Sequence, residues 1–372
     1  MRKVLSKEKV LFSIIVVCKN EERVIENTLC SVINQTYSNF EIIVQDGKST
    51  DNTISLVNRL KGKDNRIKIV SEEDNGIYSA MNKALTKVEG EYVYFLNAGD
   101  AFYDERVLFS IDKCIREKKP DIILGRYLSK RHEQEIIVTP IEEKSLLEHV
   151  KEGNGICHQS IFAQKDCLLD GFDENYKFSA DFDWVCKQVK DNKKIINTDT
   201  VIAKYDKFGI SSLAKNWKRV QAECKDIIQR NFQVDSKTAD RYYVERYRIV
   251  KSQKMLECMN DFLALKQKNK DLCTYFEKRG IKTVAIYGYH FLGQRLHEEL
   301  MNTLVRVKYI IDRNCVLQNV GIPLISLNNE LEKVDAIVIT PIFDYYEIKD
   351  VLEQKINCTI LSIEDVINGM YE

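Results

Sequence analysis

The sequence lacks the features that mark several classes of protein. Its 11 cysteines are scattered and no two form a Cys-x-x-Cys pair, which argues against a zinc site and against a compact disulfide framework. Reduced thiols in a cytosolic protein fit this pattern better. The formal net charge is +0, with 56 basic and 56 acidic residues, so the composition gives no reason to expect a nucleic-acid partner.

Long hydrophobic runs are also missing. The apolar run at residues 10–17 is too short to cross a membrane, charged residues follow it, and no small-residue cleavage site is evident. We interpret this run as part of a first strand. The chain of 372 residues is longer than a single hydrophobic core usually serves, which favours two domains.

The first half alternates short apolar runs with segments of helical periodicity. The runs with strand character are at residues 12–18, 40–44, 67–70 and 92–96. Between them, apolar residues recur at the spacing of amphipathic helices. This alternation predicts an α/β fold with a doubly wound, mostly parallel sheet.

Polar residues follow the end of each predicted strand. They are Asn20 and Glu21, Asp46, Asp74 and Asp100. Each of them, taken singly, could cap the helix that follows. Together they favour a site, because ligands in open α/β sheets bind outside the carboxyl ends of the strands.

The second half predicts a helical connector followed by a smaller domain. Residues 213–279 are charged and helical in pattern, and the basic residues there more often mark a solvated face than a lipid contact. Further strands are predicted at residues 283–287, 305–311, 336–340 and 359–363, which indicates a Rossmann-like domain. We therefore expect domains at residues 1–212 and 280–372, joined by the connector.

The segment Gly288–Gly293, GYHFLG, is half of a dinucleotide fingerprint. Its middle glycine, which normally lets the backbone approach a pyrophosphate, is replaced by His290. Asp312 lies where a ribose-binding acid would follow. A structural or protein-contact use is favoured over binding of NAD.

Six segments in order resemble glycosyltransferase family 2, the inverting enzymes with the GT-A fold. They are IIVVCKNEE, VQDGKSTDNT, DNGIYSAMNKAL, GEYVYFLNAGD, CHQSIF and SADFDW. The last two are similar to the bacterial subfamily that builds O-antigen and other surface polysaccharides. The resemblance covers residues 12–212.

The resemblance implies roles for individual residues. Asp181 matches the base that takes the proton of the acceptor hydroxyl. His158 and Gln159 match a pair near the acceptor or the diphosphate, although a structural hydrogen-bonding role for His158 is as well supported. The residues that match positions around the nucleotide-sugar are Asn20, Glu21, Asp46, Ser49, Asn82, Asn97 and Asp100.

Asp100 also matches the last acid of the family's metal-binding motif. Asn97 and Gly99 stand where that motif usually has acids, so Asp100 is its one carboxylate. The resemblance implies a divalent ion, Mn²⁺ or Mg²⁺, that bridges the diphosphate. A second departure is Ala180, where many relatives have a glutamate before the base.

We thus expect an inverting glycosyltransferase of surface polysaccharide synthesis. It would use a UDP- or GDP-linked sugar and a saccharide or polyprenyl-linked saccharide acceptor. It would be cytoplasmic. Contact with the inner face of the membrane and self-association are both left open. The alternatives are a catalytically degenerate nucleotide-sugar-binding module and a nucleotidyltransferase on a similar fold.

Overall fold

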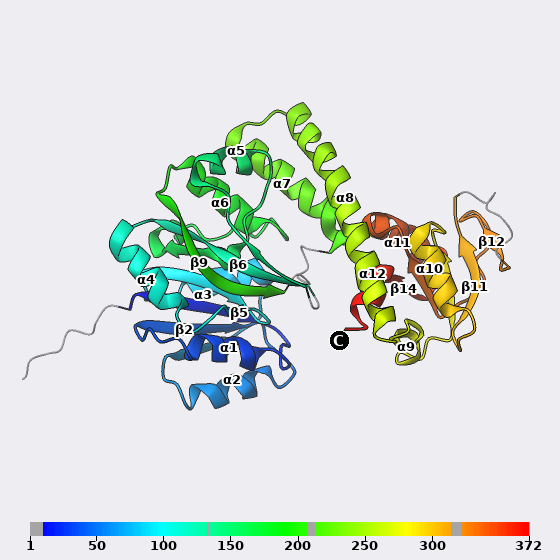
Figure 1. Cartoon of the computed structure of the whole chain (residues 1–372), viewed down its shortest axis with the longest axis horizontal. Helices are drawn as coiled ribbons and strands as arrows, with labels where there is room; N and C mark the ends of the chain where they lie inside the picture. Colours follow the sequence, from blue (N-terminus) through cyan, green and yellow to red (C-terminus); the bar gives the residue numbers. More distant parts are fainter. Residues whose placement is uncertain (1–9, 132–133, 207–212, 314–320, 372) are drawn as a thin grey trace, which may run out of the picture. The chain divides into compact units, whose positions relative to one another are not determined.

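The computed structural model describes residues 10–131, 134–206, 213–313 and 321–371. The described parts of residues 1–209 and 220–243 form one compact unit, and those of residues 210–219 and 244–372 form another (Figure 1). The division falls within the two helices α7 (Trp217–Phe232) and α8 (Ser236–Gln267). The domain limits at residues 212 and 279 stay predictions.

The first unit is built around a large mixed sheet. Its strand order is β3-β2-β1-β4-β8-β6-β9-β5, with β7 paired to β6. The strands are β1 (Phe12–Cys18), β2 (Phe40–Asp46), β3 (Ile67–Ser71), β4 (Tyr92–Asn97), β5 (Ala101–Phe102), β6 (Ile122–Arg131), β7 (Gln134–Val138), β8 (Ile161–Gln164) and β9 (Ile195–Asp206). All four strands predicted in this half of the sequence are confirmed.

Parallel pairing holds from β3 to β4, as strand–helix alternation predicts. Beyond β4 the sheet changes, because β8 lies antiparallel between β4 and β6. This strand has only four residues and follows a loop and the 3-10 turn at His158–Ser160, so strand–helix alternation gives no sign of it. The parallel register places Val17 opposite Asn97 and Cys18 opposite Asp46, which aligns the carboxyl ends of β1, β2 and β4 at one edge.

Helices cover the sheet and fill the spaces between strands. They are α1 (Ile25–Ile33), α2 (Thr53–Lys61), α3 (Ile77–Leu85), α4 (Val107–Lys118), α5 (Leu146–Lys151) and α6 (Ala180–Lys190), with a short 3-10 turn, η2 (His158–Ser160), before β8. Both faces of the central strands are buried. In β1, Ile15 and Val17 pack in one core cluster, while Ile14 and Val16 pack in the other. This two-sided burial explains why the strands read as unbroken apolar runs.

The second unit contains a smaller, fully parallel sheet in the order β12-β11-β10-β13-β14. Its strands are β10 (Thr283–Tyr287), β11 (Arg306–Ile311), β12 (Leu324–Ile325), β13 (Ala336–Ile339) and β14 (Thr359–Ser362), and its helices beyond α8 are α9 (Cys273–Glu277), α10 (Phe291–Leu300), α11 (Tyr345–Glu353) and α12 (Ile363–Asn368). The four predicted strands are confirmed. The two-residue β12 was not predicted, because so short a segment carries no periodicity.

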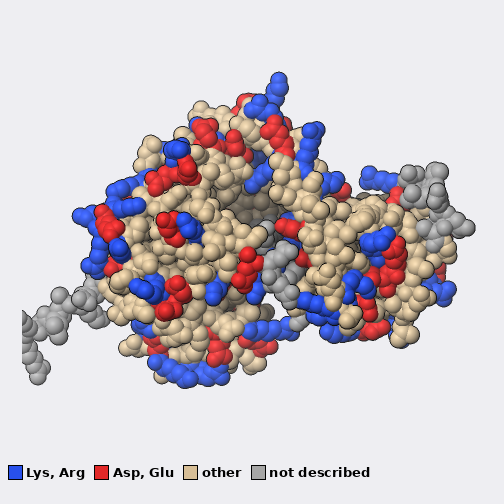
Figure 2. Space-filling model, viewed as in Figure 1, with Lys and Arg blue, Asp and Glu red and all other residues tan. Residues whose placement is uncertain are grey.

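The surface carries charges of both signs. Figure 2 shows Lys and Arg side chains mixed with Asp and Glu over the visible face. In the part of the chain that the structure describes, no helix has the length and apolar character that crossing a membrane needs.

Candidate active site

Asn97 ends β4 on the face of the sheet that α6 covers. Alternate strand residues point to opposite faces, so Val93, Phe95 and Asn97 share one face. Val93 and Phe95 pack with Trp184 of α6 in one core cluster. Asn97 therefore ends this apolar row with a side-chain amide at the carboxyl edge of the sheet.

The amide of Asn97 contacts an imidazole that in turn contacts a carboxylate. Asn97 Nδ2 lies 3.1 Å from His158 Nε2, and His158 Nδ1 lies 3.0 Å from Asp181 Oδ2. His158 belongs to η2 and Asp181 to the first turn of α6. Three segments far apart in the sequence thus meet through hydrogen bonds at one edge of the sheet.

The other oxygen of Asp181 is also held. The Tyr78 hydroxyl donates to Asp181 Oδ1 at 2.9 Å, and the backbone N–H of Phe182 donates to the same oxygen at 2.9 Å. The start of a helix favours a negative charge at this position. The Asp181 side chain is still 20% exposed. It is therefore a fixed carboxylate that solvent reaches.

The hydrogen-bond directions follow from the donors. With the Asn97 amide oriented so that Nδ2 faces the ring, His158 Nε2 accepts, and a neutral ring then donates its Nδ1 proton to Asp181. Burial and then the charge of Asp181 raise the pKa of Tyr78 well above its usual range, so the phenol keeps its proton and serves as a donor. Both side chains thus donate to Asp181.

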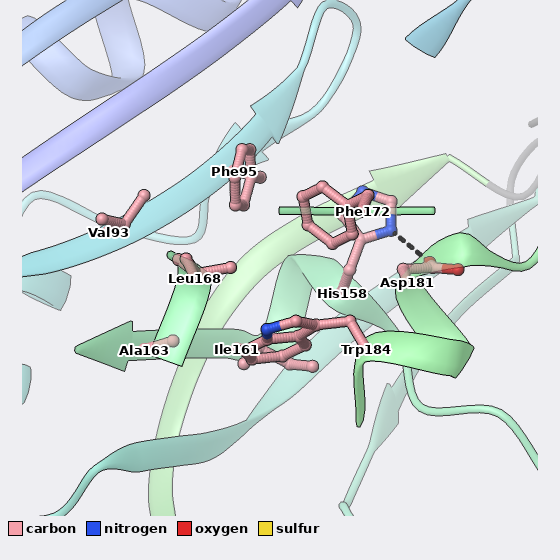
Figure 3. A pocket seen from close by; sticks show the side chains of 9 residues that line it. All are labelled: Val93, Phe95, His158, Ile161, Ala163, Leu168, Phe172, Asp181 and Trp184. Atoms are coloured by element: carbon pink, nitrogen blue, oxygen red, sulfur yellow. Dashed lines mark hydrogen bonds and ion pairs between the residues drawn. The ribbon is translucent and has the colours of Figure 1, made fainter. Parts of the chain in front are cut away.

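A small apolar cavity lies beside this network (Figure 3). At the polar end of the cavity the ring of His158 faces Asp181. Phe95, Phe172 and Trp184 are among the apolar walls of the cavity. Its volume is about 20 Å³, room for one water molecule. A sugar ring is too large for this space.

Asp100 is almost fully buried. The residue is 5% exposed, and Gln159 Nε2 donates to its Oδ2 at 2.9 Å. Thr28 Oγ1 accepts from the Gly99 N–H and donates to the Asp100 carbonyl, which fixes the turn. Among the described residues no group of three or more His, Cys, Asp or Glu side chains could hold a metal ion. The donor set fits an ion only if a diphosphate supplies further ligands.

The loops after β1 and β2 are joined by hydrogen bonds. Asn20 donates its N–H to Ser49 Oγ and accepts from the Thr50 N–H, both at 2.8 Å. The Asp46 carboxylate is fully buried and accepts from the Ser49 N–H and hydroxyl and from Ser71 Oγ. Asp46 thus organises the loop, and its predicted contact with a nucleotide stays a prediction.

Glu21 differs from these neighbours. Its backbone N–H donates to Thr53 Oγ1 at 2.7 Å, but no donor to its carboxylate is recorded among the described residues. Burial, followed by the charge of Asp51, raises the pKa of Glu21. A half-buried carboxylate without a donor is suited to accept a hydrogen bond from a ligand.

The side-chain amide of Asn82 holds the turn at Phe172 and Glu174. Its Nδ2 donates to the Phe172 carbonyl at 2.8 Å and to Glu174 Oε1 at 2.9 Å, and its Oδ1 accepts from the Phe172 N–H at 2.8 Å. These bonds tie α3 to the segment before α6. Its role as a nucleotide contact stays a prediction, since the described bonds use both donors of the amide.

The comparisons with known proteins concern this unit. Residues 13–167 match the family model described as glycosyl transferase family 2. This part of the chain belongs to glycosyltransferase family 2. The expected fold class, α/β with a large sheet and a second smaller one, is confirmed by the two sheets.

Relatives of this glycosyltransferase include a PGL/p-HBAD biosynthesis glycosyltransferase of Mycobacterium tuberculosis. It is 27% identical over 206 residues, covering 54% of this chain and 78% of the relative. The glycosyltransferase GlyG of Streptococcus pneumoniae is 28% identical over 118 residues, which is 32% of this chain and 39% of that protein. The crystal structure of S. aureus TarS 1-349 with UDP-GlcNAc has 22% identity and a TM-score of 0.49, and the match covers 63% of this chain and 71% of that one.

Two residues of the candidate site were not named from the sequence. Tyr78 lies in a segment that resembles the family, but its hydroxyl only becomes relevant once α3 is placed 2.9 Å from Asp181. Thr28 lies on the buried face of α1 and holds the turn of Gly99 and Asp100. Neither has a local signal beyond helical periodicity, since their partners are 103 and 72 residues away in the sequence.

Proposed function

We propose that this glycosyltransferase transfers a sugar with inversion and that Asp181 is its general base. The observation that carries the proposal is the fixed, partly exposed carboxylate at the start of α6. Asp181 is held at both oxygens, by His158 and by Tyr78, yet solvent reaches it. A general base must be oriented toward the proton that it removes, and the hydrogen bonds from His158 and Tyr78 fix the orientation of Asp181.

The step needs one carboxylate. The acceptor hydroxyl oxygen attacks the anomeric carbon while the bond from that carbon to the diphosphate oxygen breaks. The acceptor proton passes to Asp181, and the bonding electrons leave with the nucleoside diphosphate. Attack from the face opposite the leaving group inverts the configuration, and no covalent enzyme intermediate is required.

Two donors hold the carboxylate of Asp181 in one orientation. Correct placement of the base contributes strongly to the rate of a proton transfer. His158 and Tyr78 are therefore positioning residues in this proposal, and His158 acts through Asp181.

The nucleotide-sugar is proposed to lie across the carboxyl edge of the sheet. Asn20, Glu21 and Ser49 would line its nucleoside end, with Asp46 fixing the position of Ser49. Glu21 supports this because its carboxylate has no donor among the described residues. Gln159 would act near the diphosphate through Asp100, to which it donates.

A divalent ion, if used, would be held by Asp100 together with diphosphate oxygens. It would neutralise the charge that builds on the leaving diphosphate. Removal of divalent ions with EDTA and return of Mn²⁺ tests this part. Nucleotide release that is unchanged after EDTA treatment would contradict it.

The acceptor is proposed to be a saccharide or a lipid-linked saccharide of a surface polysaccharide. The CHQSIF and SADFDW segments support this through their resemblance to enzymes of that kind. The donor is proposed to be linked to UDP or GDP. We propose that the reaction takes place in the cytoplasm, with contact to the inner face of the cell membrane left open.

The stereochemical outcome tests the proposal without knowledge of the acceptor. A panel of UDP- and GDP-linked sugars is first screened for slow hydrolysis, in which water takes the place of the acceptor. Proton NMR at early times then reports the anomeric configuration of the released sugar. We expect the inverted anomer and a nucleoside diphosphate. The retained anomer would contradict the single-base mechanism, and release of pyrophosphate would indicate a nucleotidyltransferase.

A further inference from the structure

The segment that precedes the proposed base has no regular structure of its own. Residues 169–179 lie within the described part of the chain and form neither helix nor strand. The side chain of Ser179, the residue before α6, makes no capping hydrogen bond with the described first turn of that helix. Backbone N–H groups outside helices and strands need other acceptors when they are withdrawn from water. The position of Asp181 therefore depends on groups outside this segment.

The helix α7 supplies such a group. The Glu223 carboxylate accepts two backbone hydrogen bonds, from the Lys177 N–H to Oε1 and from the Phe178 N–H to Oε2, both at 2.9 Å. Each oxygen of one carboxylate is thus used for one of two successive N–H groups. Hydrogen bonds to a charged acceptor are about twice as strong as those between neutral groups. Glu223 therefore holds the chain just before Asp181.

The core in turn holds α7 beside α6. Ile227 of α7 is buried in the core cluster that also contains Phe182 of α6. Asn231 Nδ2 donates to Oδ1 of the buried Asp183 at 2.9 Å. Residues four positions apart share a face of a helix, so Glu223, Ile227 and Asn231 lie on the face of α7 that meets α6 and the segment before it. Glu223 is therefore carried by a helix that packing and a polar contact both fix.

Phe178 connects Glu223 with the hydroxyl group that holds Asp181. The Tyr78 hydroxyl lies 3.0 Å from the Phe178 carbonyl oxygen and 2.9 Å from Asp181 Oδ1. A phenol has one proton, so these two acceptors share one donor. The place of the Phe178 carbonyl therefore affects both where the Tyr78 hydroxyl lies and how strongly it bonds to Asp181.

We propose that Glu223 is a positioning residue for the general base. It holds the N–H groups of Lys177 and Phe178, which sets the Phe178 carbonyl and through it the Tyr78 hydroxyl at Asp181. Glu223 thereby joins the hydrogen-bond network of Asp181 without touching a substrate. The inference rests on the proposed role of Asp181 as the base. It also extends the transferase site to α7, a helix that the sequence pattern predicts as part of a connector.

Two substitutions in the full chain test the proposal. Glu223→Ala removes both acceptors and introduces a residue that favours helix, whereas Glu223→Gln keeps one acceptor oxygen. A misplacement of about 1 Å can lower turnover about 10²-fold, so kcat for release of nucleoside diphosphate should fall at least about tenfold in Glu223→Ala. Glu223→Gln should recover part of this loss. KM for the donor should change little, because the groups proposed to bind the nucleoside lie on the loops after β1 and β2.

Glu117→Ala is the matched control. Glu117 lies on the exposed side of α4 in the same unit as Glu223, so its loss should leave kcat close to that of the unchanged chain. Hydrogen exchange gives a measurement that needs no turnover. Peptides covering residues 176–182 should exchange faster in Glu223→Ala than in the control, since two N–H groups have lost their acceptor.

A double-mutant cycle tests whether Glu223 acts through Asp181. In the Asp181→Asn background the base is already lost, so Glu223→Ala should lower kcat little further. A role that Glu223 plays only in folding would give the same fold-change in both backgrounds. That result would overturn the proposal.

Other results would also overturn it. They are a normal kcat in Glu223→Ala, a rise in KM as its sole effect, and unchanged exchange of residues 176–182. If Glu223→Ala does not fold, a normal kcat in Glu223→Gln would have the same meaning. Failure of the base assignment is separate, because Asp181→Asn alone would then turn over at a near-normal rate while the exchange result for Glu223→Ala would be unaffected.

Discussion

Two clusters at the carboxyl edge of the larger sheet use the same residue types in different ways. After β1 and β2, Asp46 is fully buried and accepts from Ser49 and Ser71, so its bonds serve the loops. Between β4, η2 and α6, Asp181 is also held by donors, yet 20% of its side chain is exposed. One carboxylate stabilises the edge and the other is presented to solvent.

This difference teaches that an acid at a strand end is not by itself a ligand group. Its use depends on how many of its acceptor positions the chain has already filled and on what solvent can reach. Variants of the Asp181 cluster should therefore affect turnover with little loss of stability. Variants of groups whose hydrogen bonds serve other residues of the chain should lower stability with little effect on turnover.

The largest effect is expected for Asp181→Asn. The amide cannot accept the acceptor proton, so turnover should fall about 10²- to 10⁴-fold, the usual contribution of a general base. The measurement is donor-dependent release of nucleoside diphosphate, with the thermal midpoint measured alongside.

Asp170→Asn is the control for that variant. Asp170 is exposed and lies outside the hydrogen-bond network of His158 and Asp181, so the same chemical change should leave release unaltered. Near-normal turnover of Asp181→Asn would show that the carboxylate is not the base.

A smaller effect is expected for Tyr78→Phe. The change removes the hydroxyl that donates to Asp181 Oδ1 at 2.9 Å, a hydrogen bond to a charged group. We expect kcat to fall about tenfold while KM for the donor changes little. Tyr176→Phe is matched to it, because that hydroxyl also contacts an aspartate, Asp226, away from the site. An equal fall in kcat for both variants would point to a general packing effect.

The smallest effect on turnover is expected for Asn82→Ala. The loss of its bonds to Phe172 and Glu174 should lower the free energy of unfolding by about 2 kcal/mol, measured by urea denaturation. Asn58→Ala, on the exposed side of α2, should cost much less. An increase in KM for the donor without a loss of stability would instead support the predicted nucleotide contact of Asn82.

Much of the fold could be predicted because buried parallel strands read as apolar runs. The runs at residues 12–18 and 92–96 are both strands, and their parallel direction follows from the helices between them. β8 and β12 could not be predicted in this way. β8 has four residues and pairs antiparallel, and β12 has two residues, so neither leaves a periodic signal.

The residues of the candidate site could be predicted from the sequence, but the hydrogen bonds between them could not. Asn97, His158 and Asp181 were all named from the sequence, yet their contact with one another depends on where η2 and α6 lie. The commitment of Asn82 to the Phe172 turn has the same origin, since its partners are 90 residues away. Hydrogen bonds between distant segments are set by packing, which local patterns do not encode.

The central claim is that His158 works through the proton on Nδ1, which it gives to Asp181. The most direct test compares His158→Asn, whose amide nitrogen can take the place of Nδ1, with His158→Gln, whose amide reaches the place of Nε2. The account predicts that His158→Asn keeps at least about tenfold more turnover than His158→Gln, at similar thermal stability. Equal turnover of the two variants, or higher turnover of His158→Gln, would contradict it.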